Sequence, residues 1–327
     1  RPQTLYAYVS RGRLEARPDP EDPRRSLYSA EDIERLASRR SGPKRAAEIA
    51  RASIAWGEPV LTSKLTVIAE GRLCYRGVDA IDLSQTATLE AAARGRSRAM
   101  LATDAATVLE TLVDAATGGT GDGPIHQRLG AAWALDPDGA DLVRRALVLM
   151  LDHELNASTF SARVAASTGA SLSACALAGL STLSGPLHGA AVSGVLAFLS
   201  EAKLLGVDVA VRARLDEGRA LPGFGHPLYP GGDPRATELL ARFEVPEKLA
   251  GILSAVANES GEYPNVDFAI GAMAQRYGLP TDAAFSVFAI GRSIGWLGHA
   301  MEQIETGSLI RPRARYAGQV PDSAARP

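Results

Sequence analysis

The sequence has few of the residues on which several common kinds of protein site depend. Of its 327 residues only Cys74 and Cys175 are cysteines, so neither a disulfide framework nor a cysteine metal site can be built, and a reducing, cytoplasmic location is expected. The first eight residues contain no apolar signal core. The motifs H-E-x-x-H and C-x-x-C are absent, and no two of the five histidines are four residues apart. We therefore expect no bound metal, and we do not expect a serine-hydrolase site.

An excess of charge of one sign is also missing. The 35 basic and 37 acidic residues give a net charge of −2. A protein that coats nucleic acid would carry a large basic excess, so general nucleic-acid binding is not expected. The content of 46% hydrophobic and 22% charged residues is that of an ordinary globular protein.

Charged residues are absent from one long internal stretch. Residues 164–200 contain no Asp, Glu, Lys or Arg, which on its own is typical of a membrane span. The stretch is rich in Ala, Ser and Gly, however, and Gly185-Pro186 interrupts it in the middle. We predict two fully buried helices joined by a turn, and no membrane span.

The N-terminal residues differ in character from the rest of the chain. Residues 1–51 carry 12 basic and 8 acidic residues, a net charge of +4. Residues 4–9 have helical apolar spacing, residues 17–25 form a Pro/Arg-rich loop, and Ser29 is placed to begin a helix with Asp32 three residues later. This layout resembles the second half of a MerR- or excisionase-type helix-turn-helix with its wing. The alternative is a helical extension, over residues 1–45, that packs on the main body.

The remaining sequence predicts an all-α fold with one small β-hairpin. Residues 65–68 and 73–75 alternate as strands around a turn at Glu70-Gly71. Most of the chain after this hairpin has helical periodicity. The Gly-rich residues 118–123 are not followed by Lys-Ser/Thr, so they predict a loop and no phosphate-binding P-loop.

Four segments place polar groups next to apolar helices or in Gly/Pro turns: residues 152–159, 184–191, 223–235 and 262–267. The first is either a solvated helix end or the wall of a cleft. His188, in the second, lies near a helix start that disfavours the imidazolium, and it is either a neutral donor or a core histidine.

In the third segment, Asp233 and Pro234 are typical of a helix start. The cation of Arg235 in the first helical turn is unfavourable, unless an anion such as a substrate carboxylate compensates it. The alternative is a surface loop with an incidental Arg. In the fourth segment, Asp267 taken alone is most simply a helix cap.

These segments carry motifs that occur together in one family. In order along the chain they are D-H-E-L-N-A-S-T, G-P-L-H-G-A, G-F-G-H…D-P-R, P-N-V-D, G-R-S-I-G-W and I-R-P-R, over residues 145–318, with a weaker match at residues 71–77. The sequence strongly resembles the citrate synthase family. The resemblance implies a helical homodimer whose subunits have a large domain, residues 46–189 and 281–327, and a small domain, residues 190–280, that closes over a cleft.

The resemblance also implies roles for individual residues. His188 matches the group that bonds the thioester oxygen, Asp267 the base that deprotonates the acetyl methyl, and His226 the group that polarises the ketone of oxaloacetate. The carboxylates of oxaloacetate would be held by His153, Arg235, Arg292 and, across the dimer interface, Arg311. Arg313 also falls in the last motif, and His299 is expected to be structural.

The implied activity is condensation of acetyl-CoA with oxaloacetate and water to citrate and CoA, a step of the tricarboxylic acid cycle. Acetyl-CoA is then a co-substrate, with no permanently bound cofactor. Propionyl-CoA as substrate and a metabolite-sensing regulator are the alternatives, while a citryl-CoA lyase is less favoured. Two departures from the family pattern are a shortened region between Ser84 and Asp138 and an uncharged stretch, Pro227–Pro230, where relatives carry basic residues for coenzyme A.

Overall fold

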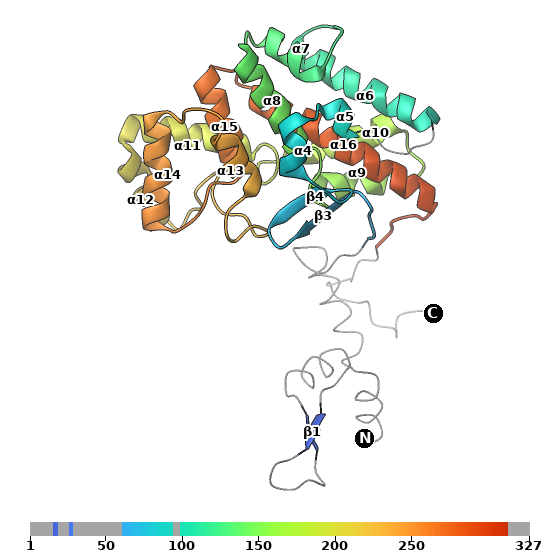
Figure 1. Cartoon of the computed structure of the whole chain (residues 1–327), viewed down its shortest axis with the longest axis horizontal. Coiled ribbons are helices and arrows are strands. Elements are labelled where there is room, and N and C mark those ends of the chain that lie inside the picture. Colours follow the sequence, from blue (N-terminus) through green and yellow to red (C-terminus); the bar gives the residue numbers. More distant parts are fainter. Residues whose placement is uncertain (1–15, 19–25, 29–60, 94–98, 313–327) are drawn as a thin grey trace, which may run out of the picture. The chain divides into compact units, whose positions relative to one another are not determined.

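The computed structural model describes residues 16–18, 26–28, 61–93 and 99–312 (Figure 1). The chain divides into two units, residues 1–62 and 63–327, later than the boundary near residue 45 that composition suggested. In the first unit, β1 (Ala16–Pro18) pairs antiparallel with β2 (Ser26–Tyr28), so the first two residues predicted as loop belong to a strand. The helices expected at residues 4–9 and after Ser29 lie outside the described residues, so the helix-turn-helix hypothesis stays a prediction.

The second unit is mostly helical, which confirms the predicted fold class. Three short strands come first, and helices occupy most of the rest of its described residues (Figure 1). The elements are β3 (Thr66–Ala69), β4 (Arg72–Tyr75), β5 (Val78–Asp79), α4 (Ala80–Thr86), α5 (Leu89–Ala93), α6 (Ala99–Thr117), α7 (Ile125–Ala132), α8 (Pro137–Leu149), α9 (Ala157–Ser167), α10 (Leu172–Leu183), α11 (Ala191–Leu205), α12 (Val207–Asp216), α13 (Pro234–Leu240), α14 (Glu247–Glu259), α15 (Val266–Tyr277) and α16 (Ala283–Thr306). Residues 118–123 form the predicted loop between α6 and α7.

The predicted hairpin is present and is longer by one strand. β3 and β4 pair antiparallel around Glu70 and Gly71, whose φ angles of 51° and 75° are those of a tight hairpin turn. β5 pairs with β4 and leads into α4, where the Asp79 side chain accepts a hydrogen bond from the Ile81 N–H at 2.8 Å. The buried Tyr75 hydroxyl contacts the backbone oxygen of Leu149 at 2.9 Å, which ties the sheet to the end of α8.

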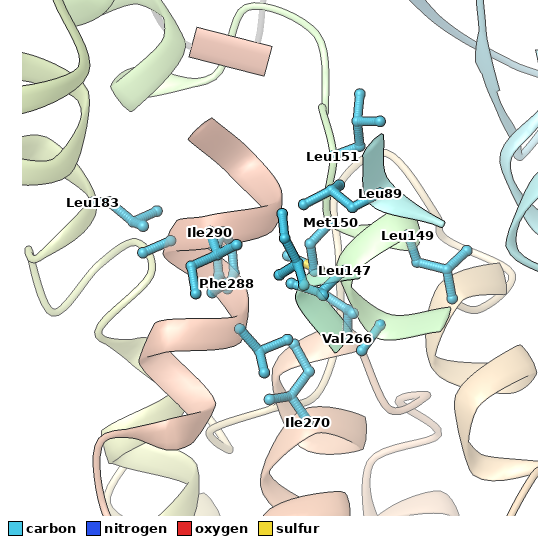
Figure 2. Packing of buried hydrophobic residues seen from close by; sticks show 14 of the residues in the cluster. Leu89, Leu147, Leu149, Met150, Leu151, Leu183, Val266, Ile270, Phe288 and Ile290 are labelled. Carbon is cyan, nitrogen blue, oxygen red and sulfur yellow. The ribbon is translucent and has the colours of Figure 1, made fainter. Parts of the chain in front are cut away.

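The main hydrophobic core lies where the end of α8 meets α15 and α16 (Figure 2). Leu147, Leu149 and Met150 come from the end of α8, and they pack with side chains of the two later helices such as Ile270 and Ile290. α16 is 24 residues long and also packs against α9 and α10, with Trp296 fully buried. One long helix thus supports several of the segments that carry polar motifs.

Two glycines let the backbone of α16 approach the end of α8 very closely. A Cβ atom on Gly291 would lie 2.8 Å from the oxygen of Leu147, and one on Gly295 would lie 2.4 Å from the carboxylate of Asp152. The N–H of Gly295 donates to the oxygen of Leu151 at 3.0 Å. The spacing of four residues puts both glycines on the same face of the helix. This face therefore holds residues 147–152 in place.

The charge-free stretch, residues 164–200, differs from the prediction. It covers the end of α9, all of α10 and most of α11, which makes three helical pieces instead of two. Full burial is also wrong, because Leu177 on α10 is 63% exposed. Ala, Ser and Gly have weak burial preferences, so the sequence did not show which face of α10 is open. Within the described part of the chain, no helix is long and apolar enough to cross a membrane.

A second, smaller core lies between α11, α12, α14 and α15. It contains Val195, Phe198, Val211, Ile252 and Phe268 among other buried residues. Gly223 approaches this core closely, since a Cβ atom there would lie 2.9 Å from the Phe268 Cβ, and its φ of 86° is open to glycine without strain. The loop that follows Gly223 is therefore anchored to the start of α15.

Candidate active site

Six of the seven predicted site residues lie together, and we call them the polar cluster: His153, His188, His226, Arg235, Asp267 and Arg292. The ring centroids of His153 and His226 are 5.2 Å apart. The charges of Arg235 and Arg292 act on both His153 and Asp267. The cluster combines residues from the α8–α9 segment, the turn before α11, the loop into α13, α15 and α16.

The segment that carries His153 is buried, so the solvated-end interpretation is wrong. Asp152 accepts hydrogen bonds from the Thr66 hydroxyl at 2.5 Å and from Nε2 of the buried His299 at 3.0 Å. Asn156 begins α9 by accepting the Thr159 N–H at 3.2 Å. Burial, followed by the charges of Arg235 and other nearby groups, lowers the pKa of His153 well below its usual range. The His153 ring is therefore neutral at pH 7.

His188 lies in the turn between α10 and α11 and contacts Ser158. The distance from its Nε2 to the Ser158 hydroxyl oxygen is 2.8 Å. Burial, followed by the charge of Arg292, lowers the pKa of His188 to about 4. Ser158 also accepts a hydrogen bond from Trp296 Nε1 at 3.0 Å and donates to Asn156 Oδ1 at 2.8 Å. Because a hydroxyl has one hydrogen, His188 Nε2 is the donor to Ser158 in this arrangement.

His226 is held by a loop that is tied to the start of α15. The Gly225 N–H donates to the backbone oxygen of Tyr263 at 2.9 Å, and the Asn265 amide donates to the oxygen of Gly225 at 3.1 Å. Burial, followed by the charge of Arg235, lowers the pKa of His226 to about 4. Its Nδ1 accepts the N–H of Leu228 at 3.2 Å, so the neutral ring carries its hydrogen on Nε2.

The two arginines of the cluster are buried, so the interpretation of Arg235 as an incidental surface residue is wrong. Asp233 caps α13 as predicted, and its carboxylate pairs with Arg235 at 2.8 Å, which supplies the expected anion from within the protein. Arg292 donates from Nε to the oxygen of Met150 at 3.0 Å and lies over the Phe288 ring. Burial lowers the pKa of Arg292 to about 10, so it remains a cation at pH 7.

Asp267 is the second residue of α15, and it does not cap the helix. The cap is Asn265, whose side chain accepts the N–H groups of Asp267 and Phe268. One carboxylate oxygen of Asp267, Oδ1, is buried and has no hydrogen-bond partner among the described residues. Burial raises the pKa of Asp267 to about 6 against the opposing effect of Arg235. A carboxylate in this state can take up a proton near neutral pH.

The remaining predicted residues lie away from the cluster or outside the described chain. Arg311 follows α16 and is exposed. Arg313 is outside the described residues. His299 forms a hydrogen bond with Asp152, the residue directly before His153, and so helps to hold Asp152 in place.

The sequence did not indicate two side chains that contact the histidines, Ser158 and Tyr229, or Trp296, which donates to Ser158. The Tyr229 hydroxyl lies 3.0 Å from His153 Nε2, although residues 227–230 were noted only for their lack of charge. Ser158 falls within the quoted motif D-H-E-L-N-A-S-T, which was the available signal for it.

Two other site types do not fit this geometry. Residues 291–295 have the pattern G-x-S-x-G of a serine-hydrolase nucleophile, so an expectation that this motif is absent is wrong, but these residues lie inside α16. The buried Ser293 hydroxyl there donates to the backbone oxygen of Ile290 at 2.7 Å. In the described residues, no group of three or more His, Cys, Asp or Glu side chains is placed to hold a metal ion.

The cluster is suited to a small anionic ligand with a carbonyl group. Arg235 and Arg292 supply permanent positive charge, and neutral histidines can donate hydrogen bonds without adding charge. Asp267 can act as a proton acceptor beside them.

Comparison with known proteins agrees with this chemistry. The family model described as "Citrate synthase, C-terminal domain" matches residues 96–313. Over 192 residues the chain is 40% identical to the citrate synthase of Haloferax volcanii, which covers 55% of this chain and 51% of that protein. Citrate synthase 2 of Bacillus subtilis is 37% identical over 193 residues, which are 56% of this chain and 52% of the relative. The chain thus spans about half the length of the curated relatives it matches.

Solved structures show the same fold at lower sequence identity. Citrate synthase from Thermotoga maritima superposes with a TM-score of 0.65 and 23% identity, over 80% of this chain and 94% of that one. A ternary complex of citrate synthase from Thermoplasma acidophilum with carboxymethyl coenzyme A and oxaloacetate gives a TM-score of 0.63 and 22% identity, over 82% of this chain and 96% of the other. Because the family model matches more than half of the chain, the chain belongs to the citrate synthase family.

Proposed function

We propose that this chain condenses acetyl-CoA with oxaloacetate and water to give citrate and CoA. The observation that carries the proposal is the carboxylate of Asp267, with a buried unpartnered oxygen and a pKa of about 6, beside neutral histidines and two buried arginines. The similar structure from Thermoplasma acidophilum was solved with oxaloacetate and a coenzyme A analogue. Both substrates of the proposed reaction are therefore compatible with this fold.

Oxaloacetate is a dianion, and the cluster offers it two guanidinium groups, of which Arg235 is already paired with Asp233, and two neutral donors. Arg235 and Arg292 would pair with its carboxylates, and His153 would add a hydrogen bond. His226 carries its hydrogen on Nε2, because Nδ1 accepts the Leu228 N–H, so Nε2 is the atom that would polarise the ketone oxygen. The charge of the ligand would thus be compensated in part, chiefly by Arg292, while the carbonyl carbon becomes more electrophilic.

Enolisation of the thioester would use Asp267 and His188. Asp267 would remove a proton from the acetyl methyl group, and His188 would donate to the thioester oxygen as negative charge develops there. Preorganised donors of this kind are worth roughly 2.7–4 kcal/mol each. For Nδ1 of His188 to donate, the Ser158 hydroxyl must turn from Asn156 to His188 Nε2, where its distance is already 2.8 Å.

The carbon–carbon bond would then form between the enol carbon and the ketone carbon of oxaloacetate. The ketone oxygen takes a proton from Nε2 of His226 as this bond forms, and the ring then recovers a proton, which is balanced by the one that Asp267 removed from the methyl group. Water cleaves the resulting citryl thioester, so that its oxygen enters the new carboxylate and the thiol of CoA leaves. Atoms balance with one water consumed and no electron transferred, which fits a chain proposed to need no permanent cofactor.

Closure of a small domain, residues 190–280, over the large domain is part of the same proposal. The separate core of α11, α12, α14 and α15 supports such a division. Closure would exclude water until the thioester has reacted. Arg311 would complete the site from a second subunit, and its exposed position after α16 is compatible with that role.

Propionyl-CoA is the alternative acyl substrate to acetyl-CoA in this proposal. Pro227–Pro230 contributes no basic side chain toward coenzyme A, and Tyr229 in this stretch is turned into the protein. We therefore expect a weakly saturating acyl-CoA and an ordinary KM for oxaloacetate.

The test is release of free thiol from acetyl-CoA or propionyl-CoA in the presence of oxaloacetate. Thiol release that requires oxaloacetate and disappears in Asp267→Asn supports the proposal. Binding of oxaloacetate by calorimetry without thiol release at millimolar acyl-CoA would replace it with the metabolite-sensing alternative.

A further inference from the structure

Tyr229 is the buried residue of the loop that follows His226. Its ring centroid is 4.8 Å from that of His226, with 37° between the planes. Backbone hydrogen bonds fix the loop on both sides, from the Tyr229 N–H to the oxygen of His226 at 2.9 Å and from the Gly232 N–H to the oxygen of Tyr229 at 3.0 Å. Only 2% of the residue is exposed. The position of its hydroxyl is therefore determined by the fold.

That hydroxyl lies 3.0 Å from Nε2 of His153, across the cluster from its own loop. Burial raises the pKa of Tyr229 to about 12, against the effect of Arg235, so the phenol keeps its proton at pH 7. The ring of His153 is neutral, because its pKa is lowered by burial and by Arg235 and Arg292. A neutral imidazole has one donor and one acceptor nitrogen. The direction of this hydrogen bond therefore decides whether Nδ1 or Nε2 of His153 carries the hydrogen.

The charge of Arg235 favours the phenol as the donor. The guanidinium carbon of Arg235 lies 5.4 Å from the centre of the Tyr229 ring. A cation over the ring makes the hydroxyl more acidic and its oxygen a poorer acceptor. The O–H of Tyr229 then points to Nε2, and His153 carries its own hydrogen on Nδ1. Among the described residues Nδ1 has no hydrogen-bond partner, so it is available to a ligand.

We propose that Tyr229 is a positioning residue that fixes His153 in the Nδ1–H tautomer and in one ring orientation, so that Nδ1 donates to a carboxylate of the ligand. The inference rests on the proposed function for the identity of that ligand, oxaloacetate. The geometric part of the inference depends only on the positions of Tyr229, His153 and Arg235. Without the phenol, Nε2 loses its donor, and the ring is free to adopt the other tautomer, which cannot donate from Nδ1.

The first experiment measures steady-state kinetics of Tyr229→Phe, which keeps the aromatic ring and removes only the hydroxyl. We expect the KM for oxaloacetate to rise about tenfold, the effect of one hydrogen bond, with kcat and the KM for acyl-CoA unchanged. Tyr263→Phe is the matched control, since Tyr263 is a half-exposed tyrosine in the neighbouring loop, and its kinetics should equal those of the unmodified protein. An unchanged oxaloacetate KM in Tyr229→Phe would overturn the proposal. A general loss of kcat would do so as well.

The second experiment reads the tautomer directly by NMR of the full chain labelled with ¹⁵N-histidine. The signal of His153 is identified by its loss in His153→Gln. In the unmodified protein it should have the shifts of an Nδ1–H imidazole, and in Tyr229→Phe these should move toward the Nε2–H form. An Nε2–H signal in the unmodified protein refutes the inference even if Tyr229→Phe does not fold. The readout needs no turnover, so loss of the proposed function and loss of this inference are separate results.

Discussion

The carboxylate of Asp233 and the guanidinium of Arg235 form a buried, two-point ion pair. Nε of Arg235 donates to Oδ1 at 2.9 Å and Nη2 donates to Oδ2 at 2.8 Å. Oδ2 also accepts the N–H of Val266, the first residue of α15, at 3.0 Å. One carboxylate therefore connects the start of α13 to the start of α15, where Asp267 lies.

We predict that Asp233→Asn destabilises the protein by roughly 3–5 kcal/mol, because it leaves the buried charge of Arg235 uncompensated. Equilibrium unfolding by urea measures the loss. The control is Glu259→Gln, which breaks the exposed pair with Arg212 and should cost at most about 1 kcal/mol. Equal stability losses in the two variants would contradict the importance of the buried pair.

Turnover should depend on the carboxylate of Asp267. Asp267→Asn preserves the shape of the side chain and removes the proton acceptor, so we expect kcat to fall by roughly 10²–10⁴ with the fold intact. Thiol release measures kcat, and circular dichroism checks the fold. Turnover close to that of the unmodified protein would exclude Asp267 as the base.

The activity of the unmodified protein should fall in acid. Because the pKa of Asp267 is about 6, the free protein loses its base as the pH drops below that value. The logarithm of kcat/KM should therefore rise with pH up to about 6 and then level off, while His188 and His226, with pKa values of about 4, stay neutral throughout. If the logarithm of kcat/KM does not change between about pH 5 and pH 7, another group is the base.

Whereas activity should rise with pH because of Asp267, the free energy of unfolding should fall with pH because of the same residue. The folded state holds a proton on Asp267 up to about pH 6, whereas an unfolded carboxyl loses it near pH 3.9, so stability falls as the pH rises between these values. Asp267→Asn lacks this penalty and should be more stable than the unmodified protein at pH 7, by at most about 3 kcal/mol. The difference should disappear below about pH 4. Thermal unfolding at the two pH values measures both, and a variant that is less stable at pH 7 would contradict the prediction.

Packing around Trp296 offers a test in the core. A Cβ on Gly179 of α10 would lie 2.6 Å from the Trp296 ring, so Gly179→Ala should cost roughly 1–3 kcal/mol by overpacking. Gly194→Ala is the matched control on α11, where the nearest atom would be 3.8 Å away, and the higher helix propensity of Ala should stabilise by up to about 1 kcal/mol. Urea unfolding compares the two, and equal effects would show that Trp296 moves freely.

Local sequence signals were sufficient where one residue determines one feature. Asp233 before Pro234 predicted the start of α13, and Glu70-Gly71 predicted the hairpin turn. The family motifs also pointed to six residues that the structure brings together, although they come from five separate segments, while the roles of these residues stay predictions. Each of these features depends on the residue types in one short segment, so it could be predicted without knowledge of the packing.

Features that depend on contacts between side chains distant in the sequence could not be predicted from local signals. Tyr229 lies in a stretch noted for its lack of charge, yet its hydroxyl reaches His153, 76 positions away. Asp267 resembles a helix cap in the sequence, but Asn265, two residues earlier, has the same capping ability and takes that role in the structure. The open face of α10 was missed because Ala, Ser and Gly fit both buried and exposed positions.

The bare backbone contact at Gly291 and Gly295 has a consequence for how this protein can diverge over time. Arg292 lies between these glycines and bonds Met150, while His153 follows directly after the segment they hold. The separation of Arg292 and His153 therefore depends on the close approach of α16 to residues 147–152 at these two glycines. Exchanges among the nearby apolar side chains that keep their volume should leave this separation unchanged, whereas a single added methyl group on either glycine would alter it.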